Sequence, residues 1–371
     1  MRKKRVFILS ALFIVAVAAG AWVFFFWLAP RASGPLRQEV YVWQRAWTQP
    51  VRDAVSQHAT NFAEIAVLKA EISWSTNRQP QLTRVAVDYE TLAKARRPVG
   101  IALRIGPYAG PFVPPGDFGL RGQAQRDPAF AAAAQGTNDS KAPSSLRSAG
   151  AVQDPSVTDY ICNIAAGIVN EARTNRVLLA ELQIDFDCAE SKLDGYRVWI
   201  EAIQHRVAPL PVTITALPSW LDSRAFKRLA AVATNYVLQV HSAERPKSFD
   251  APFTLCDPRA ARRAVERAGR IGVPFRVALP TYGYLLAYEP GGKFISLAAE
   301  GPRPNWPTNA QLREVSSDAV ALATLLQEWT ADRPVAMRGV IWYRLPVATD
   351  KHNWNWPTLR GVMRGETPDP K

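Results

Sequence analysis

The amino-acid sequence predicts an α/β protein, a (β/α)8 TIM barrel preceded by one N-terminal transmembrane helix. Three observations lead to this prediction. Short apolar runs rich in β-branched residues recur along the chain, most are followed by a segment with helical spacing, and a long uncharged apolar run stands near the N-terminus. Strands that alternate with helices form parallel sheets, and 371 residues suffice for one closed barrel, typically of about 250 residues. An open doubly wound sheet is the alternative, but no glycine-rich phosphate loop follows the first predicted strand.

A basic stub and an apolar run form the predicted membrane anchor at residues 1–30. Four basic residues at 2–5 precede residues 6–29, which carry no charge and, as a helix, span a hydrocarbon layer of about 30 Å. Because basic residues stay on the cytoplasmic side, we expect a single-pass protein of the inner membrane with its C-terminal domain in the periplasm. A signal-peptidase-like site at 16–18 makes a secreted or periplasmic protein, released by cleavage, the alternative.

Eight segments carry the strand pattern, and the barrel is predicted to span residues 39–360. A linker at 31–38 precedes it, and a C-terminal tail at 361–371 follows it. Two connections are long: an insertion at about 107–153, rich in Pro, Gly, Ala, Ser and Gln, and a second connection at 284–307. The predicted strands are 39–47, 64–74, 99–106, 182–188, 211–217, 236–242, 274–281 and 339–345.

Capping residues mark the predicted helices between the strands. Asp257-Pro258 offers an N-cap followed by proline in the first turn, and Gly272 suits the left-handed position after the same helix. The other predicted starts are Asp154-Pro155, Ser191 before a helix at 193–206, and Ser316-Ser317 before a helix that reaches Trp329.

The charge of the chain favours an anionic partner. The net charge is +13, and without the four basic residues of the stub the exported part carries +9. Such a domain can lie near anionic lipid headgroups or an acidic polysaccharide, and nucleic acid is not an expected partner on that side of the membrane. We expect one disulfide among Cys162, Cys188 and Cys256, with the pairing left open. Neither the cysteines nor the four histidines have zinc-site spacing, so we expect no metal and no cofactor.

An apolar run ending in three carboxylates stands at the end of the fourth predicted strand. Because alternate residues of a strand share a face, Asp185 and Asp187 point the same way, while Ile184 and Phe186 point the other way. Neighbouring like charges shift each other's pKa, as acid/base catalysis requires, although an aspartate after a strand is equally typical of a turn or a helix cap. Glu190 is the third carboxylate.

Aromatic and polar residues also stand at the other strand ends, the face that carries catalysis in such barrels. Aromatic rings stack on sugars and polar groups bond their hydroxyls, so the set predicts a carbohydrate cleft, although a single Trp more often packs in a core. Glu71 can instead pair with Lys69 as a structural bridge. Arg104 is expected to anchor a carboxylate, either from Asp185 or from an acidic substrate. The expected substrate-binding residues are Arg104, Trp220, Gln239, His241, Tyr282, Trp342 and Arg344.

Several of these segments carry a family resemblance. With Leu103-Arg104-Ile105-Gly106, Gln183-Ile184-Asp185-Phe186-Asp187 and Leu279-Pro280-Thr281-Tyr282-Gly283 in this order, residues 39–346 resemble a family of bacterial exported proteins that has no established activity. More distantly, the chain resembles the chitinase-type glycoside hydrolases, whose fourth strand ends in Asp-x-Asp-x-Glu with the Glu as general acid. Asp185 and Asp187 match the two aspartates, Ala189 stands at the glutamate position, and Glu190 follows one residue later. Tyr282 and Trp342 resemble a site tyrosine and the tryptophan floor of the sugar subsite.

The resemblance and the residue pattern together imply a membrane-anchored glycoside hydrolase-like protein that acts on an envelope or exported polysaccharide. Asp187 or Glu190 is the expected proton donor and Asp185 its electrostatic partner. The group that stabilises or activates the attacking species is expected to be Glu71, His241 or Tyr282. His241 fits a hydrogen-bonding residue of the core equally well. The alternative is a non-catalytic glycan-binding barrel, which Ala189 favours. A metal-dependent hydrolase built on Asp185, Asp187 and His241 is less favoured, because these residues lack a recognised ligand spacing.

Overall fold

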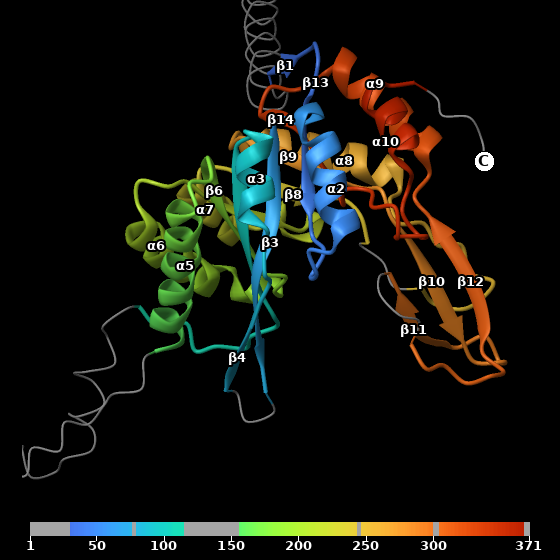
Figure 1. Ribbon diagram of the computed structural model, residues 1–371, viewed down its shortest axis with the longest axis horizontal. Helices are drawn as coiled ribbons and strands as arrows, with labels where there is room; N and C mark the ends of the chain where they lie inside the picture. The colour runs from blue at the N-terminus through green and yellow to red at the C-terminus, as the bar shows by residue number, and fades with distance from the viewer. Residues whose placement is uncertain (1–29, 76–78, 115–155, 243–245, 300–303, 367–371) are drawn as a thin grey trace, which may run out of the picture.

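Eight parallel strands close into a barrel at the centre of the molecule (Figure 1). The computed structural model describes residues 30–75, 79–114, 156–242, 246–299 and 304–366. The barrel strands are β2 (Arg37–Val42), β3 (Glu64–Trp74), β5 (Val99–Ile105), β6 (Leu179–Asp185), β7 (Val212–Ala216), β8 (Tyr236–Gln239), β9 (Phe275–Pro280) and β14 (Met337–Tyr343). They pair in the order β2-β14-β9-β8-β7-β6-β5-β3, and the pairing of β2 with β3 closes the circle. The predicted (β/α)8 barrel is confirmed.

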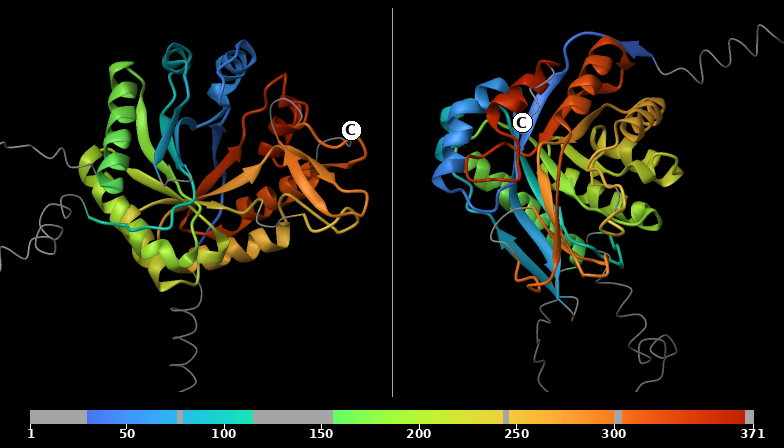
Figure 2. Two further views of the ribbon diagram at one scale, coloured as in Figure 1. Left: turned by 90° about the horizontal axis from the view of Figure 1, so that it is seen from below. Right: turned by 90° about the vertical axis from the view of Figure 1, so that its right-hand side faces the viewer.

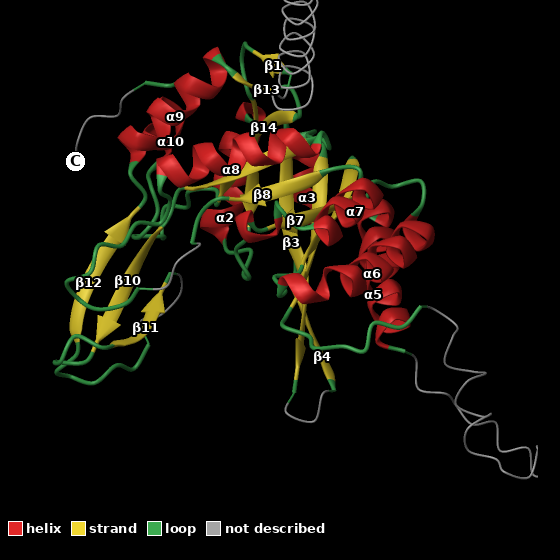
Figure 3. Ribbon diagram, turned by 180° about the vertical axis from the view of Figure 1, so that it is seen from behind, coloured by secondary structure: helices red, strands yellow, loops and turns green. Residues whose placement is uncertain are grey.

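A helix follows each barrel strand and lies on the outside of the barrel (Figure 2 and Figure 3). The helices are α2 (Gln49–His58), α3 (Tyr89–Ala95), α5 (Val157–Thr174), α6 (Leu193–Val207), α7 (Arg224–Ala233), α8 (Pro258–Ile271), α9 (Ala319–Ala331) and α10 (Trp356–Met363). As predicted, Asp257 caps α8 by accepting from the Arg259 amide, and Gly272 ends it with a φ of 79°.

Other helix starts differ from the predicted ones because neighbouring side chains make the capping bonds. Asp318, after the predicted Ser316-Ser317, accepts from the Ala321 amide and caps α9. Ser191 lies inside a 3-10 turn, η2 (Glu190–Lys192), that runs directly into α6, so it caps nothing. Ser156 caps α5, while the predicted Asp154-Pro155 lies outside the described residues.

Two β structures extend from the end of the barrel at which its strands finish (Figure 1). One is a hairpin in which β4 (Pro80–Arg84) pairs antiparallel with the end of β3. The other is a three-stranded antiparallel sheet of β10 (Gly283–Tyr288), β11 (Phe294–Ala298) and β12 (Gln311–Ser316), with β10 in the middle. Strands β10 and β11 lie in the region predicted only as a long connection at 284–307, and β12 follows that region.

Several predicted boundaries need correction. The segment predicted as a linker contains β1 (Arg31–Ala32), which pairs with β13 (Arg333–Pro334). The Arg31 guanidinium also binds Glu266 and Asp332, at 2.7 Å each. Helix α10 continues to Met363, past the predicted end of the barrel. The three cysteines, all in described segments, are free thiols rather than partners in a disulfide.

The N-terminal and insertion predictions fall largely outside the described residues. No helix in the described part of the chain is both long and apolar enough to cross a membrane. The predicted anchor lies outside the described residues apart from Pro30, as does the predicted insertion from residue 115 onward.

The apolar core lies between the barrel and its helices. On β6 and just after it, the outward residues Ile184 and Phe186 are fully buried, and Phe186 packs against Tyr196 and Trp199 of α6 with ring centroids 5.1 and 5.2 Å apart. The inward residues of the same strand are polar, as the period of two requires. The inner face of β6 is therefore built from charged and hydrogen-bonded groups.

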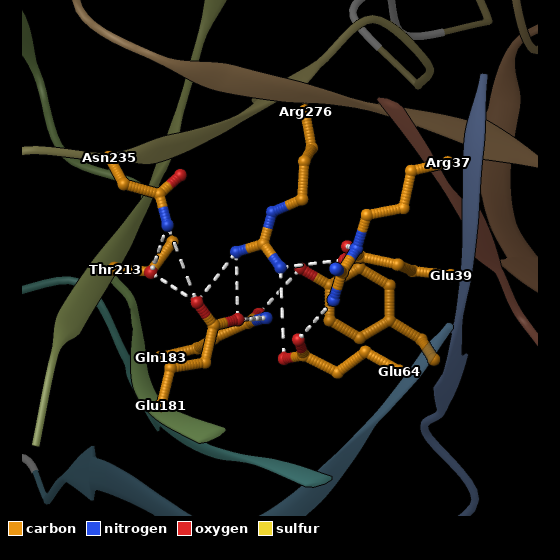
Figure 4. Close-up of polar contacts among 9 residues, drawn as sticks. Arg37, Glu39, Glu64, Glu181, Gln183, Thr213, Asn235 and Arg276 are labelled. Atoms are coloured by element: carbon orange, nitrogen blue, oxygen red, sulfur yellow. Dashed lines mark hydrogen bonds and ion pairs between the residues drawn. The ribbon is translucent and has the colours of Figure 1, made fainter. Parts of the chain in front are cut away.

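Arg276 of β9 is at the centre of a buried charge network in this interior (Figure 4). Its guanidinium donates to both Glu181 oxygens at 2.7 and 2.8 Å and to Glu39 at 2.6 Å, and lies 3.8 Å from Glu64. Arg37, at the edge of the network, donates to Glu39 at 2.6 Å and to Glu64 at 3.0 Å. Three carboxyl groups thus face two guanidinium groups inside the barrel.

The pKa values of two glutamates in this network shift in opposite directions. Burial, then the nearby charges of Glu181 and Glu39, raise the pKa of Glu64 to about 8. Burial also acts to raise the pKa of Glu181, but the charge of Arg276 and a hydrogen bond from Thr213 outweigh it and lower that pKa. At neutral pH, Glu64 is therefore largely protonated.

Candidate active site

A pocket of about 250 Å³ opens at the carboxyl ends of the strands, between the barrel and the three-stranded sheet. Its wall combines rings with groups that carry charge or hydrogen-bonding capacity. The rings belong to Tyr41, Trp43, His241, Tyr282, Tyr284 and Tyr343. The other polar groups belong to Arg104, Asp185, Asp187, Thr215, Gln239, Ser242 and Arg344. The pocket thus contains seven of the residues predicted for the site.

Asp185 and its neighbours form a charged layer across three adjacent strands. The strand register places Glu71 of β3 opposite Arg104 of β5, and Arg104 opposite Asp185 of β6. One Asp185 oxygen accepts from the Thr215 hydroxyl at 2.8 Å, and the other lies 3.7 Å from Nε of Arg104. Burial raises the pKa of Asp185, while Arg104 and the Thr215 hydrogen bond oppose the shift. Asp185 is therefore held in place from two sides.

Asp187 stands two residues further along, on the same face, as predicted. Partial removal from water, followed by the charge of Asp185, raises the pKa of Asp187 to about 6, and Arg104 opposes the shift. The residue is nevertheless exposed at the mouth of the pocket, so a ligand can reach its carboxyl group. A carboxyl group that is protonated for part of the physiological pH range and accessible to ligand meets the first requirement for a general acid.

Glu71 lies beside the pocket, where its carboxylate binds Arg45. The Arg45 guanidinium binds both Glu71 oxygens, at 2.7 and 2.8 Å, and Arg104 approaches only to 3.6 Å. The suggested bridge to Lys69 does not form, because a β-bulge between Leu68 and Ala70 changes the facing of the strand. Lys69 instead donates to the Val85 carbonyl at 3.0 Å and pairs with Glu171 at 2.7 Å.

His241 and three hydroxyl groups form a hydrogen-bonded cluster on the opposite wall. The Tyr282 hydroxyl lies 3.2 Å from Nδ1 of His241 and 3.1 Å from the Tyr284 hydroxyl, and the Ser242 hydroxyl contacts both tyrosines. His241 also stacks on the Tyr343 ring with centroids 5.3 Å apart. Burial lowers the pKa of His241 to about 3, so the imidazole is neutral and positions the Tyr282 hydroxyl.

Arg344 and Gln239 complete the pocket. Arg344 is buried; its guanidinium binds the Asp350 carboxylate and donates to the Ala299 carbonyl at 3.0 Å. These contacts tie β14 to the end of the three-stranded sheet, close to the Tyr282 ring, whose centroid lies 5.8 Å from the guanidinium carbon. The half-buried Gln239 of β8 faces the same space.

Besides Glu71, three residues predicted for the site lie outside the pocket. Glu190 is exposed in η2, where the chain has already turned into α6. Trp220 is buried and donates to the Cys188 carbonyl at 3.1 Å. Trp342 is buried with its indole donating to Gln38 at 2.8 Å, beside Trp354. Among the described residues, no cluster of three or more His, Cys, Asp or Glu side chains has an arrangement that suits a metal ion.

Other pocket residues were not among the predicted ones. Tyr41 and Trp43 come from β2 and the residue after it, where alternation with the inward Glu39 would have placed them on the inner face. Tyr284 comes from the three-stranded sheet, whose position relative to the barrel no local pattern indicates. Tyr343 and Thr215 carry no sequence signal beyond their strands.

Comparison with known proteins supports the fold. Two crystal structures of the spore cortex-lytic enzyme SleL superpose on 91% of this chain: that from Bacillus megaterium with a TM-score of 0.54 and 12% identity, and that from Bacillus cereus with 0.55 and 11%. The match covers 75% of each SleL chain. A chitinase from Bacteroides thetaiotaomicron matches over 91% of this chain and 98% of its own, with a TM-score of 0.51 and 12% identity.

Sequence comparison gives one family. The model of a domain of unknown function, DUF3142, matches residues 144–348, more than half of the chain. No curated protein is detectably similar in sequence. The predicted distant similarity to chitinase-type glycoside hydrolases is confirmed at the level of the fold.

Proposed function

This chain belongs to the DUF3142 family, and we propose that it is a glycoside hydrolase-like protein that binds a polysaccharide in the pocket and cleaves it with Asp187 as proton donor. The observation that carries the proposal is the position of Asp187. It is exposed to a ligand, its pKa is raised to about 6, and a second carboxylate stands on the same strand face. A glycosidic oxygen needs an acid of this kind.

The rest of the pocket fits a sugar. Rings on the wall offer stacking surfaces, and hydroxyl, amide and guanidinium groups stand between them. Asp185, which is held by Thr215, supplies the negative charge that stabilises an oxocarbenium-like transition state. The Tyr282 hydroxyl, positioned by neutral His241, is the candidate donor on the opposite wall.

The test is the release of reducing ends from a panel of envelope and exported polysaccharides. Asp187→Asn keeps the shape of the side chain and removes the acid, so we expect at least a hundredfold loss of rate, within the usual contribution of acid catalysis, about 10²–10⁴-fold. Asp222→Asn is the matched control, because Asp222 pairs with Arg267 on the surface and lies outside the pocket. Equal rates in the wild type and in Asp187→Asn would reject Asp187 as the donor.

A specific observation favours a second candidate, a non-catalytic glycan-binding barrel. Glu190 lies outside the pocket, Ala189 has no acid to offer, and Glu71 is bound by Arg45. On this alternative, the protein binds oligosaccharides without releasing fragments. Glycan-array binding and reducing-end release, measured on the same preparation, separate the two candidates.

The location forms a separate part of the proposal. The basic stub and the apolar run at 6–29 support attachment to the inner membrane with the barrel on the periplasmic side. Fractionation of cells and protease accessibility of the barrel in spheroplasts test it. Recovery of the barrel in the cytosolic fraction would reject this location.

A further inference from the structure

Arg104 stands in the pocket with its hydrogen-bonding capacity largely unused. Its side chain is 42% exposed, and within the described residues it makes no hydrogen bond. The two acidic groups nearest to it lie at 3.6 Å, in Glu71, and at 3.7 Å, in Asp185. An arginine that serves only to hold neighbouring strands together would be expected to make closer, two-pronged contacts.

Both acidic groups near Arg104 have closer partners than Arg104. Arg45 takes both oxygens of Glu71, and the Thr215 hydroxyl takes one oxygen of Asp185. On the far wall, Arg344 is bound to Asp350. The guanidinium group of Arg104 therefore remains available to bind a ligand in the pocket.

We propose that Arg104 is the specificity-determining residue of the pocket and binds a carboxylate carried by the saccharide, so that the substrate class is an acidic glycan. The inference rests on the proposed glycan-binding function of the same pocket. A guanidinium fork matches the two oxygens of a carboxylate, whereas sugar hydroxyls are served equally well by amides and hydroxyls. The positive charge of the exported part, +9, favours the approach of such a polyanion.

The two aspartates of the pocket repel an acidic ligand. Asp185 and Asp187 line the same pocket and disfavour a second anion, so the preference for an acidic ligand depends on the contact with Arg104 rather than on the overall charge of the pocket. Removing the Arg104 charge should therefore do more than abolish the preference. It should reverse it.

The experiment measures the affinity of the full chain for matched acidic and neutral ligands by calorimetry. One pair is a hyaluronan tetrasaccharide and its carboxyl-reduced form; the other is a muramic acid disaccharide and the amide of its lactyl group. In at least one pair we expect the wild type to bind the acidic form roughly tenfold more tightly or better, the scale of a hydrogen bond to a charged group. The pair that shows the preference identifies the source of the carboxylate.

The variants separate recognition from folding. Arg104→Gln should bind the acidic form more weakly than the neutral form, and the readout is the ratio of these two affinities within the variant. Arg104→Lys keeps the charge without the fork and should retain only part of the preference. Arg228→Gln, which removes an exposed arginine paired with Asp194 on the outside of the barrel, should behave as the wild type.

The possible failures are distinct. If the wild type binds neutral and acidic forms equally, or if Arg104→Gln keeps the preference, the assignment of Arg104 is overturned while glycan binding stands. If no saccharide of either kind binds, the proposed function itself fails.

Discussion

Glu64 makes the stability of the barrel depend on pH, and replacing it by glutamine tests this. Burial and two neighbouring carboxylates raise its pKa in the folded protein to about 8, from 4.5 in a free chain. Below pH 4.5 the group is protonated in both states and contributes no pH dependence. Between the two values the unfolded chain has released its proton and the folded chain keeps it. Stability therefore falls as the pH rises, by about 1.4 kcal/mol per pH unit and by on the order of 5 kcal/mol over the window.

The assay is urea unfolding, followed by tryptophan fluorescence at several pH values within this window, for the wild type and Glu64→Gln. Glutamine can still accept a hydrogen bond from Arg37 and carries no proton to lose. The free energy of unfolding of the variant should therefore increase steadily relative to that of the wild type as the pH rises. Asp187 titrates in the same range in both proteins, and its contribution cancels in the difference. Glu90→Gln on the exposed surface of α3 serves as the control. Parallel pH profiles for the wild type and Glu64→Gln would refute the reasoning.

Three further predictions concern the site and its support. If Asp187 donates the proton, activity should fall as the pH rises through about 6, because the folded-state pKa is raised and the acid form is lost there; a reducing-end assay that shows constant activity from pH 5 to pH 8 would contradict this. Arg276→Met should cost about 3–5 kcal/mol in urea unfolding, since Glu181 would remain buried without its cation; an unchanged midpoint would show that the pairing contributes little. Gly195→Ala should lower the Tm despite the better helix propensity of alanine, because the new Cβ would lie 2.3 Å from the Phe112 ring; a raised Tm would mean that the ring moves aside freely.

Strand alternation was the most reliable guide from sequence to structure. It predicted all eight barrel strands and placed Asp185 and Asp187 on one inward face, because a period of two is a property of the backbone and needs no knowledge of the partner strand. The same rule failed at Lys69 and Glu71, where a bulge inserts one residue and reverses the facing. A bulge depends on the neighbouring strand, which the local sequence does not reveal.

The tryptophans at strand ends show a second limit. Trp220 and Trp342 stand at predicted strand ends, yet both indoles are buried beside the barrel and donate to groups outside the pocket. Chain position indicates the height of a side chain along the barrel, whereas its direction depends on the turn that follows. Glu190 illustrates the same point, since η2 carries it away from the axis.

Long-range assembly accounts for most of what sequence reasoning missed. Arg276 lies within an otherwise apolar strand, and nothing nearby in the sequence indicates that its partners are Glu39 and Glu181, from strands far away along the chain. Likewise, Tyr284 reaches the pocket only because the three-stranded sheet folds back beside the barrel. The first contact follows from closure of the barrel, and the second from the position of the three-stranded sheet beside it.

The division of β6 into a polar inner face and an apolar outer face also bears on how such a protein can change over evolutionary time. The residues that hold the helices to the barrel, such as Ile184 and Phe186, alternate with those that face the pocket, such as Asp185 and Asp187. A substitution on the inner face can therefore alter the chemistry with little loss of the packing that keeps the chain folded. Asp185 and Asp187 can thus be exchanged for other polar residues while Ile184 and Phe186 continue to hold the helices against the barrel.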